Sequence, residues 1–223
     1  MRVAVLTLFV AAGASAQPAI QPGAPGEPAR AVAPGTVAAR PPVTPADVAF
    51  VQGMIPHHAQ ALDMTALAPS RTTRTDVLTM AGRIEVAQGD EIAWMQRWLR
   101  DHAPSAGDAA HGHSAGHGAH AGHLMPGMLT PDEMAALAAS TGAEFDRLFL
   151  TGMIRHHEGA LTMVEELLTT PGAAQDPLVF RFAVDIDADQ RADIARMQAM
   201  LAATGSRSDA SPPASAPSGH SHH

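Results

Sequence analysis

An internal duplication constrains the fold of this chain more than any other feature of its sequence. Residues 47–64 read DVAFVQGMIPHHAQALDM and residues 146–163 read DRLFLTGMIRHHEGALTM, with ten of 18 positions identical. A second pattern, acid-x-x-Gln-x-x-acid-Ile-x-x-Met-Gln, begins at Glu85 and again at Asp187. Each half is therefore predicted to form a helical hairpin. Two such hairpins bury their apolar stripes against each other, so the expected fold is an all-α four-helix bundle.

Capping residues mark the start of four predicted helices, and Gly205 is typical of a helix terminator. The caps are Thr44, Thr130, Thr141 and Asp176. The predicted helices span about 45–68, 74–102, 131–140, 143–169 and 177–203.

The remaining segments lack apolar periodicity and carry distinctive compositions. An apolar run followed by Ala14-Ser15-Ala16 predicts a cleaved signal peptide, and no later stretch approaches the roughly 20 apolar residues that insert stably in a membrane. The mature protein is therefore expected to be periplasmic or secreted. The predicted parts are a signal peptide at 1–16, a disordered Pro/Ala-rich tether at 17–43, a bundle at 44–203 (hairpin 44–102, His-rich linker 103–129, hairpin 130–203) and a disordered tail at 204–223.

The composition excludes several classes of function. All 14 basic residues are Arg and stand against 22 acidic residues, a net charge of −8, whereas nucleic-acid binding requires a basic face. The absence of Cys excludes disulfides, thiolate zinc sites, iron–sulfur clusters and cysteine nucleophiles. Any metal site must therefore use imidazole, thioether or carboxylate groups, and the chain has 13 His and 12 Met.

The duplicated motif places both kinds of soft or borderline ligand on one apolar helical arc. Met54, His57 and Met64 follow each other at helical spacing, and His58 lies on the adjoining stripe. Imidazole with thioether favours Cu(I) and its surrogate Ag(I), with Cu(II) on imidazole alone as a further possibility. The predicted metal ligands of the two copies are Met54, His57, His58, Met64, Met153, His156, His157 and Met163.

Other residues leave alternatives open. The acid and Gln residues of the second helices, such as Glu91 and Asp193, could orient the histidines by hydrogen bonds or form a solvated face. A carboxylate-bridged di-iron oxidase is an alternative, but Met54 and Met153 occupy the places where such a site needs an acid. A structural bundle with hydrogen-bonded core histidines is another. The linker is predicted to capture Cu(II), Zn(II) or Ni(II) loosely through exposed histidines: His111, His113, His117, His120 and His123.

The two Met-x-x-His-His copies, each followed by Gln-x-x-Glu/Asp-Ile-x-x-Met, resemble the ferritin-like family catalogued as domain of unknown function 305, over about residues 44–202. The resemblance implies a ferritin-like four-helix bundle. For members with a studied role, it also implies periplasmic copper and silver binding linked to metal resistance. The same eight Met and His positions are the ligands that it implies.

These observations lead to a hypothesis of an exported copper-binding protein that sequesters or chaperones the ion without catalysis. Its expected partners are metal ions, and the sequence identifies no delivery protein. Because a ligating imidazole must be neutral, copper affinity is expected to fall below about pH 6.5.

Overall fold

The computed structural model describes residues 19–21, 28, 30–32, 41–102 and 124–208. The predicted signal peptide, the five linker histidines and the tail histidines lie outside these residues. The chain divides into two units, Met1–Arg40 and Pro41–His223. In the first unit, β1 (Ala19–Gln21) pairs antiparallel with β2 (Arg30–Val32), with Ile20 opposite Ala31. The sequence predicts a disordered tether at residues 17–43, so this strand pair is not predicted.

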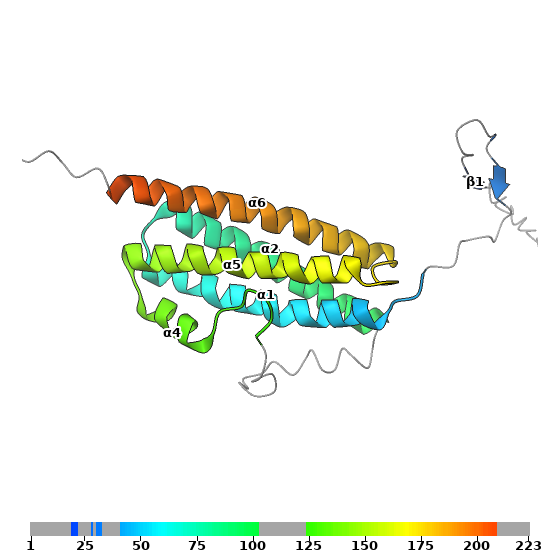
Figure 1. Ribbon diagram of the computed structural model, residues 1–223, viewed down its shortest axis with the longest axis horizontal. Helices are drawn as coiled ribbons and strands as arrows, with labels where there is room; N and C mark the ends of the chain where they lie inside the picture. The colour runs from blue at the N-terminus through cyan, green and yellow to red at the C-terminus, as the bar shows by residue number, and fades with distance from the viewer. Residues whose placement is uncertain (1–18, 22–27, 29, 33–40, 103–123, 209–223) are drawn as a thin grey trace, which may run out of the picture. The chain divides into compact units, whose positions relative to one another are not determined.

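The described residues of the second unit form the predicted four-helix bundle and the short helix predicted near residues 131–140 (Figure 1). Helix α1 packs along α2, α5 packs along α6, and the two hairpins meet through α1 and α5. The short α4 touches both α1 and α5. The helices are α1 (Pro45–Arg71), α2 (Thr75–His102), α4 (Pro131–Ala139), α5 (Gly142–Thr169) and α6 (Pro177–Ser208).

Most of the predicted helix caps are confirmed. Thr44 and Thr130 form capping boxes with the residues three positions later, and the carboxylate of Asp176 accepts from Leu178 N at 2.9 Å. Thr141 is the N-cap of α5 as predicted, but within the described residues its side chain makes no cap hydrogen bond, and Gly142 begins the helix with a φ of 59°. One prediction about a helix end is wrong. Helix α6 continues past Gly205 to Ser208, since a helix interior tolerates a single glycine at about 1 kcal/mol.

The core has a two-fold pattern that follows from the duplication. Helices α1 and α5 run in opposite directions (Figure 1). Their middles meet where His156 Nε2 lies 2.8 Å from the carbonyl of His57, and we call this point the crossing. One apolar cluster lies at each side of the crossing, and each cluster contains methionines from both copies. The first includes Met54 and Met163, and the second includes Met64 and Met153. The chain segments between these clusters carry the four motif histidines.

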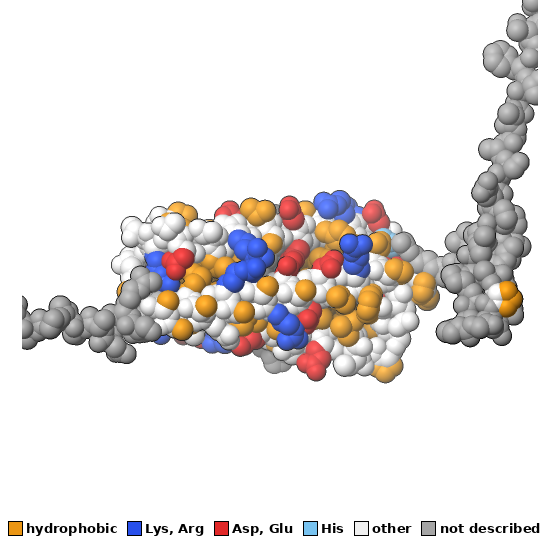
Figure 2. Space-filling model, turned by 90° about the horizontal axis from the view of Figure 1, so that it is seen from above, with side chains coloured by type: hydrophobic (Ala, Val, Ile, Leu, Met, Phe, Trp, Pro, Cys, Tyr) orange, Lys and Arg blue, Asp and Glu red, His pale blue; other side chains and the backbone are white. Residues whose placement is uncertain are grey.

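The face of the bundle seen in Figure 2 shows no strong charge bias, because Arg, acidic and apolar side chains are interspersed on it. Across the described part of the chain, no helix is long and apolar enough to cross a membrane. The four histidines of the duplicated motif are buried completely, with relative exposures of 0%.

Asp47 links the start of α1 to the turn between α5 and α6, and its removal should destabilise the bundle. Its buried carboxylate accepts from Thr44 N at 2.8 Å and from Ala174 N at 2.7 Å. Asp47→Ala leaves both amides without this acceptor, so we expect a loss of about 2–3 kcal/mol in the free energy of unfolding. Urea unfolding measures the loss. Asp132→Ala, which removes an exposed first-turn carboxylate from α4, is the control, and equal losses in the two variants would contradict the prediction.

Candidate metal centre

The four motif histidines form one cluster at the crossing of α1 and α5. The rings of His57 and His156, one from each copy, lie with their centroids 3.9 Å apart. Within each copy the two neighbouring rings lie 6.3 Å apart at 57°, for His57 with His58 and for His156 with His157. The duplicated sequences therefore place their imidazoles in matching geometry, and the two motifs share one buried region.

The Nε2 atoms of two rings are hydrogen-bonded to carbonyl oxygens, and those of the other two have a carboxylate within 4 Å. His57 Nε2 lies 3.0 Å from the carbonyl of Pro126, and His156 Nε2 lies 2.8 Å from the carbonyl of His57. His58 Nε2 is at ion-pair distance, 2.7 Å, from Glu91 Oε2, although the angle is not that of a hydrogen bond. His157 Nε2 is 3.9 Å from Asp193 Oδ2. A carbonyl oxygen only accepts, so at least His57 and His156 carry their proton on Nε2.

The Nδ1 atoms of the same four rings are buried, and within the described residues none has a hydrogen-bond partner. In a neutral imidazole protonated on Nε2, the lone pair resides on Nδ1. Burying a polar atom without a partner costs free energy, and native proteins do so rarely. Metal-binding histidines typically show this arrangement, with one ring nitrogen donating to an oxygen while the other ligates. The donor set therefore fits a metal through Nδ1.

Burial favours the neutral form of three of these imidazoles, those of His57, His156 and His157. Burial is the main cause that lowers the pKa of His57 from 6.5 to about 4, against the opposing contact with Pro126 O. Burial also lowers the pKa of His156 well below its usual value, with the neighbouring imidazoles acting in the same direction. The pKa of His157 is lowered by burial as well, although its contact with Asp193 opposes the change. Neutral imidazole is the form that ligates a metal.

These lowered pKa values predict that acid destabilises the protein. Between pH 6.5 and about 4 the unfolded chain binds a proton at His57 that the folded chain does not, so stability falls as the pH falls through this range. For this residue the loss is about 3 kcal/mol. Chemical unfolding of the metal-free protein at a series of pH values measures it. His57→Leu should flatten the pH dependence, and an equally steep dependence in that variant would contradict the prediction.

A carboxylate from the second helix of each hairpin lies near the second histidine of each motif, His58 or His157. Glu91 of α2 contacts His58, and Asp193 of α6 is the repeat-related neighbour of His157. Arg83 and Arg196 also hold Asp193, at 3.0 and 2.7 Å. Burial alone would raise the pKa of Asp193, but its contacts with His157 and Arg83 hold it below the usual value.

The other residues of the acid-Gln-acid series differ. Glu85 is exposed, and Asp187 pairs with Arg191 at 2.8 Å, so these two acids do not contact the histidines. Gln88 and Gln190 are buried, and both polar side-chain atoms of Gln88 are unpaired within the described residues. Contacts therefore support the prediction that this series orients the histidines only for the second acid of each copy, Glu91 and Asp193.

The four motif methionines are buried beside the histidine cluster, at relative exposures of 9% or less. Two glycines retained in the duplication make room for them. A Cβ atom on Gly53 would lie 3.3 Å from Met163 Cε, and one on Gly152 would lie 3.4 Å from Met64 Cε. The second methionine of each copy therefore reaches the helix of the other copy, one turn before its His-His pair. The role of these glycines was not predicted, although their retention in both copies is a signal that could have indicated it.

No set of three or more His, Asp or Glu side chains is arranged for one ion among the described residues. The soft ligands near the imidazoles are the buried thioethers. The arrangement can thus supply neutral nitrogen and sulfur donors in an apolar, water-excluded environment, which suits a cation that accepts few, soft ligands.

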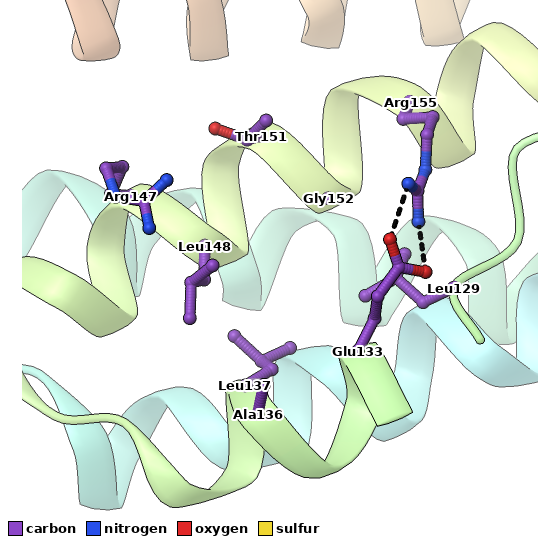
Figure 3. A pocket seen from close by; sticks show the side chains of 9 residues that line it. All are labelled: Leu129, Glu133, Ala136, Leu137, Arg147, Leu148, Thr151, Gly152 and Arg155. Atoms are coloured by element: carbon purple, nitrogen blue, oxygen red, sulfur yellow. Dashed lines mark hydrogen bonds and ion pairs between the residues drawn. The ribbon is translucent and has the colours of Figure 1, made fainter. Parts of the chain in front are cut away.

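A separate pocket lies between α4 and α5 (Figure 3). The Glu133 carboxylate and the Arg155 guanidinium pair across its rim through two hydrogen bonds of 2.7 Å. Leu129, Leu137 and Leu148 contribute apolar lining, and Gly152 borders the same space. This pocket contains none of the predicted ligands.

Comparisons with known proteins agree with this architecture. Residues 47–218 match the family model described as Domain of unknown function (DUF305). The crystal structure of a DUF305 fragment from Deinococcus radiodurans is 34% identical, with a TM-score of 0.60, over 73% of this chain and 99% of that chain. CopM in its Cu(II)-bound form is 30% identical, with a TM-score of 0.56, over 69% of this chain and 94% of that chain. Its Cu(I)-bound and Ag-bound forms are also similar, each with a TM-score of 0.51. No curated protein matches the chain.

Proposed function

The chain belongs to the DUF305 family, and from this premise we propose that it binds Cu(I) or Ag(I) in its buried imidazole–thioether cluster. One observation carries the proposal: four buried imidazoles keep an unpaired Nδ1 beside four buried thioethers, and two of them, His57 and His156, hold their proton on Nε2 through a hydrogen bond to a carbonyl oxygen. The similarity to CopM in copper-bound and silver-bound forms supports the same class of ion.

The chemistry of the donors favours a soft ion. Thioethers and imidazoles select Cu(I) over hard cations such as Mg²⁺ and Ca²⁺, which require oxygen ligands. The proposed ligands are Met54, His57, His58, Met64, Met153, His156, His157 and Met163. Because burial has already lowered the pKa of His57 to about 4, affinity should persist below the pH of 6.5 that the sequence analysis expected.

The proposed role is sequestration or chaperoning of the ion after export, with no catalytic step. A signal peptide at residues 1–16 and a periplasmic or secreted location remain part of this proposal. In an oxidising compartment, a site built without Cys avoids loss of its ligands to thiol oxidation. The His-rich linker would capture ions loosely before they enter the bundle.

A competition titration of residues 17–223 with Cu(I) and with Ag(I) tests the function. The informative comparison is a variant with the five linker histidines and the three tail histidines replaced by Ser. We expect both proteins to bind more tightly than about micromolar. If the linker-and-tail variant loses this binding, the bundle is not the site and the proposal fails.

Thermal unfolding separates the proposal from that of a purely structural bundle. A ligand that binds the native state must raise the melting temperature, whereas a bundle whose histidines serve packing alone would melt at the same temperature with and without Ag(I). Iron retained on purification would instead favour the di-iron alternative.

A further inference from the structure

The last residues of the His-rich linker, Leu124–Leu129, lie directly on the histidine cluster. Its centre, Met125-Pro126-Gly127-Met128, is a β-turn closed by Met128 N donating to Met125 O at 3.2 Å. Pro126 at the second position and Gly127 at the third, with a φ of 76°, give the geometry of a type II turn. The same turn presents the Pro126 carbonyl to His57 Nε2 at 3.0 Å. We refer to residues 124–129 as the docked turn.

Two repeat-related residues hold the docked turn. The Gln60 side chain donates to Leu129 O at 2.9 Å and accepts from Leu129 N at 2.7 Å. At the equivalent position of the second copy, Gly159 lets the backbone approach so closely that a Cβ atom there would lie 1.9 Å from Pro126 O. The two copies have therefore diverged at this position, and both residues now fit the docked turn.

Docking makes the two sides of the cluster different. Beside Gly53, the position of a Cβ atom would be 3.3 Å from Met163 Cε and 3.6 Å from Met125 Sδ. A Cβ atom on the repeat-related Gly152 would lie 3.4 Å from Met64 Cε and 3.2 Å from Leu129 Cδ2. The docked turn thus places the thioether of Met125 beside Gly53 and the isobutyl group of Leu129 beside Gly152.

We propose that Met125 is an additional thioether ligand, which makes the Gly53 side of the cluster the tighter of two Cu(I) or Ag(I) positions. This inference rests on the proposed function. Met125 packs partly buried against the apolar cluster that contains Met54 and Met163. Beside Gly53 it therefore adds a thioether to this motif pair, whereas beside Gly152 the docked turn adds the Leu129 side chain to the pair Met64 and Met153. Both clusters also contain methionines outside the motif, among them the repeat-related Met95 and Met197. Each added soft donor strengthens the binding of a soft monovalent ion.

The test is an Ag(I) titration of the full chain against a competing chelator that removes loosely held ions. Met125→Leu preserves volume and apolar character, so the fold should tolerate it. We expect it to weaken the tightest binding step by about tenfold or more. Met128→Leu, in the same turn, is the matched control and should titrate like the wild type. Leu129→Met adds a thioether on the Gly152 side and should strengthen the second binding step.

The outcomes separate this inference from the proposed function. If Met125→Leu and Leu129→Met both bind Ag(I) like the wild type, while the paired variant His57→Leu with His156→Leu loses binding, Met125 is not a ligand and the function still holds. If the wild-type bundle itself retains no Ag(I) against the chelator, the inference and the function both fail.

Discussion

Replacing His57 and His156 together by Leu is expected to lower the affinity of the bundle for Cu(I) and Ag(I) by at least about 100-fold. These two rings are the closest pair in the cluster, at 3.9 Å, and their unpaired Nδ1 atoms come from opposite halves of the molecule. Removing both deletes two nitrogen donors and leaves the thioethers without the imidazoles that they flank. Competition titration measures the loss, with His102→Leu as the control because His102 stacks on Trp98 at the end of α2.

The same paired variant should remain folded without metal, and this makes its loss of binding interpretable. Leu restores apolar volume and removes two buried imidazoles whose Nδ1 atoms have no partner in the described structure. The variant loses the hydrogen bonds of the two rings to the carbonyls of Pro126 and His57. It also no longer buries two unpaired Nδ1 atoms, and the free energy saved in this way offsets the loss. We expect the metal-free free energy of unfolding to change by no more than about 2 kcal/mol. A metal affinity equal to that of the wild type would exclude these rings as ligands.

Gly159→Ala is expected to dislodge the docked turn, because the new methyl group would overlap the Pro126 carbonyl, which is backbone and cannot rotate away. We expect a loss of about 2–3 kcal/mol in the free energy of unfolding. The exchange of the Leu129 amide hydrogen gives a local measure, since that amide donates to Gln60 Oε1 at 2.7 Å and should exchange faster once the turn is released.

Gly89→Ala is the matched control for this substitution. Gly89 also lies inside a long helix, but a Cβ atom there would meet nothing within 4 Å. Alanine has the higher helix propensity, so this variant should gain up to about 1 kcal/mol. If both variants gained stability and Leu129 kept its slow exchange, the close seating of the turn on α5 would be wrong.

Much of the fold could be predicted because the sequence repeats itself. The recurrence of Met-Ile-x-His-His predicted two equivalent hairpins, and the structure places the two histidine pairs in matching geometry. The helix starts at Thr44 and Thr130 followed from local capping chemistry, which needs no tertiary information. The end of α6 could not be predicted from local chemistry. A glycine terminates a helix only where the backbone turns left-handed, and Gly205 stays helical.

The asymmetric parts of the site could not be predicted from the repeat. The contact of His57 with Pro126 joins residues 69 positions apart and depends on how the end of the linker lies on the bundle. The sequence analysis also left open whether the two motifs share a site, since helical spacing does not specify how two hairpins cross. The structure joins them through His57 and His156. Gln60 and Gly159 gave no signal, because their roles differ between the copies.

The central claim is that the buried rings bind the ion through Nδ1, and imidazole nitrogen-15 NMR of the full chain tests it most directly. Before metal is added, the spectra should show His57 and His156 as neutral rings protonated on Nε2. On addition of Ag(I), their Nδ1 resonances should shift while the proton remains on Nε2. If the resonances of these rings stay unchanged and only histidines outside the bundle respond, the account is contradicted.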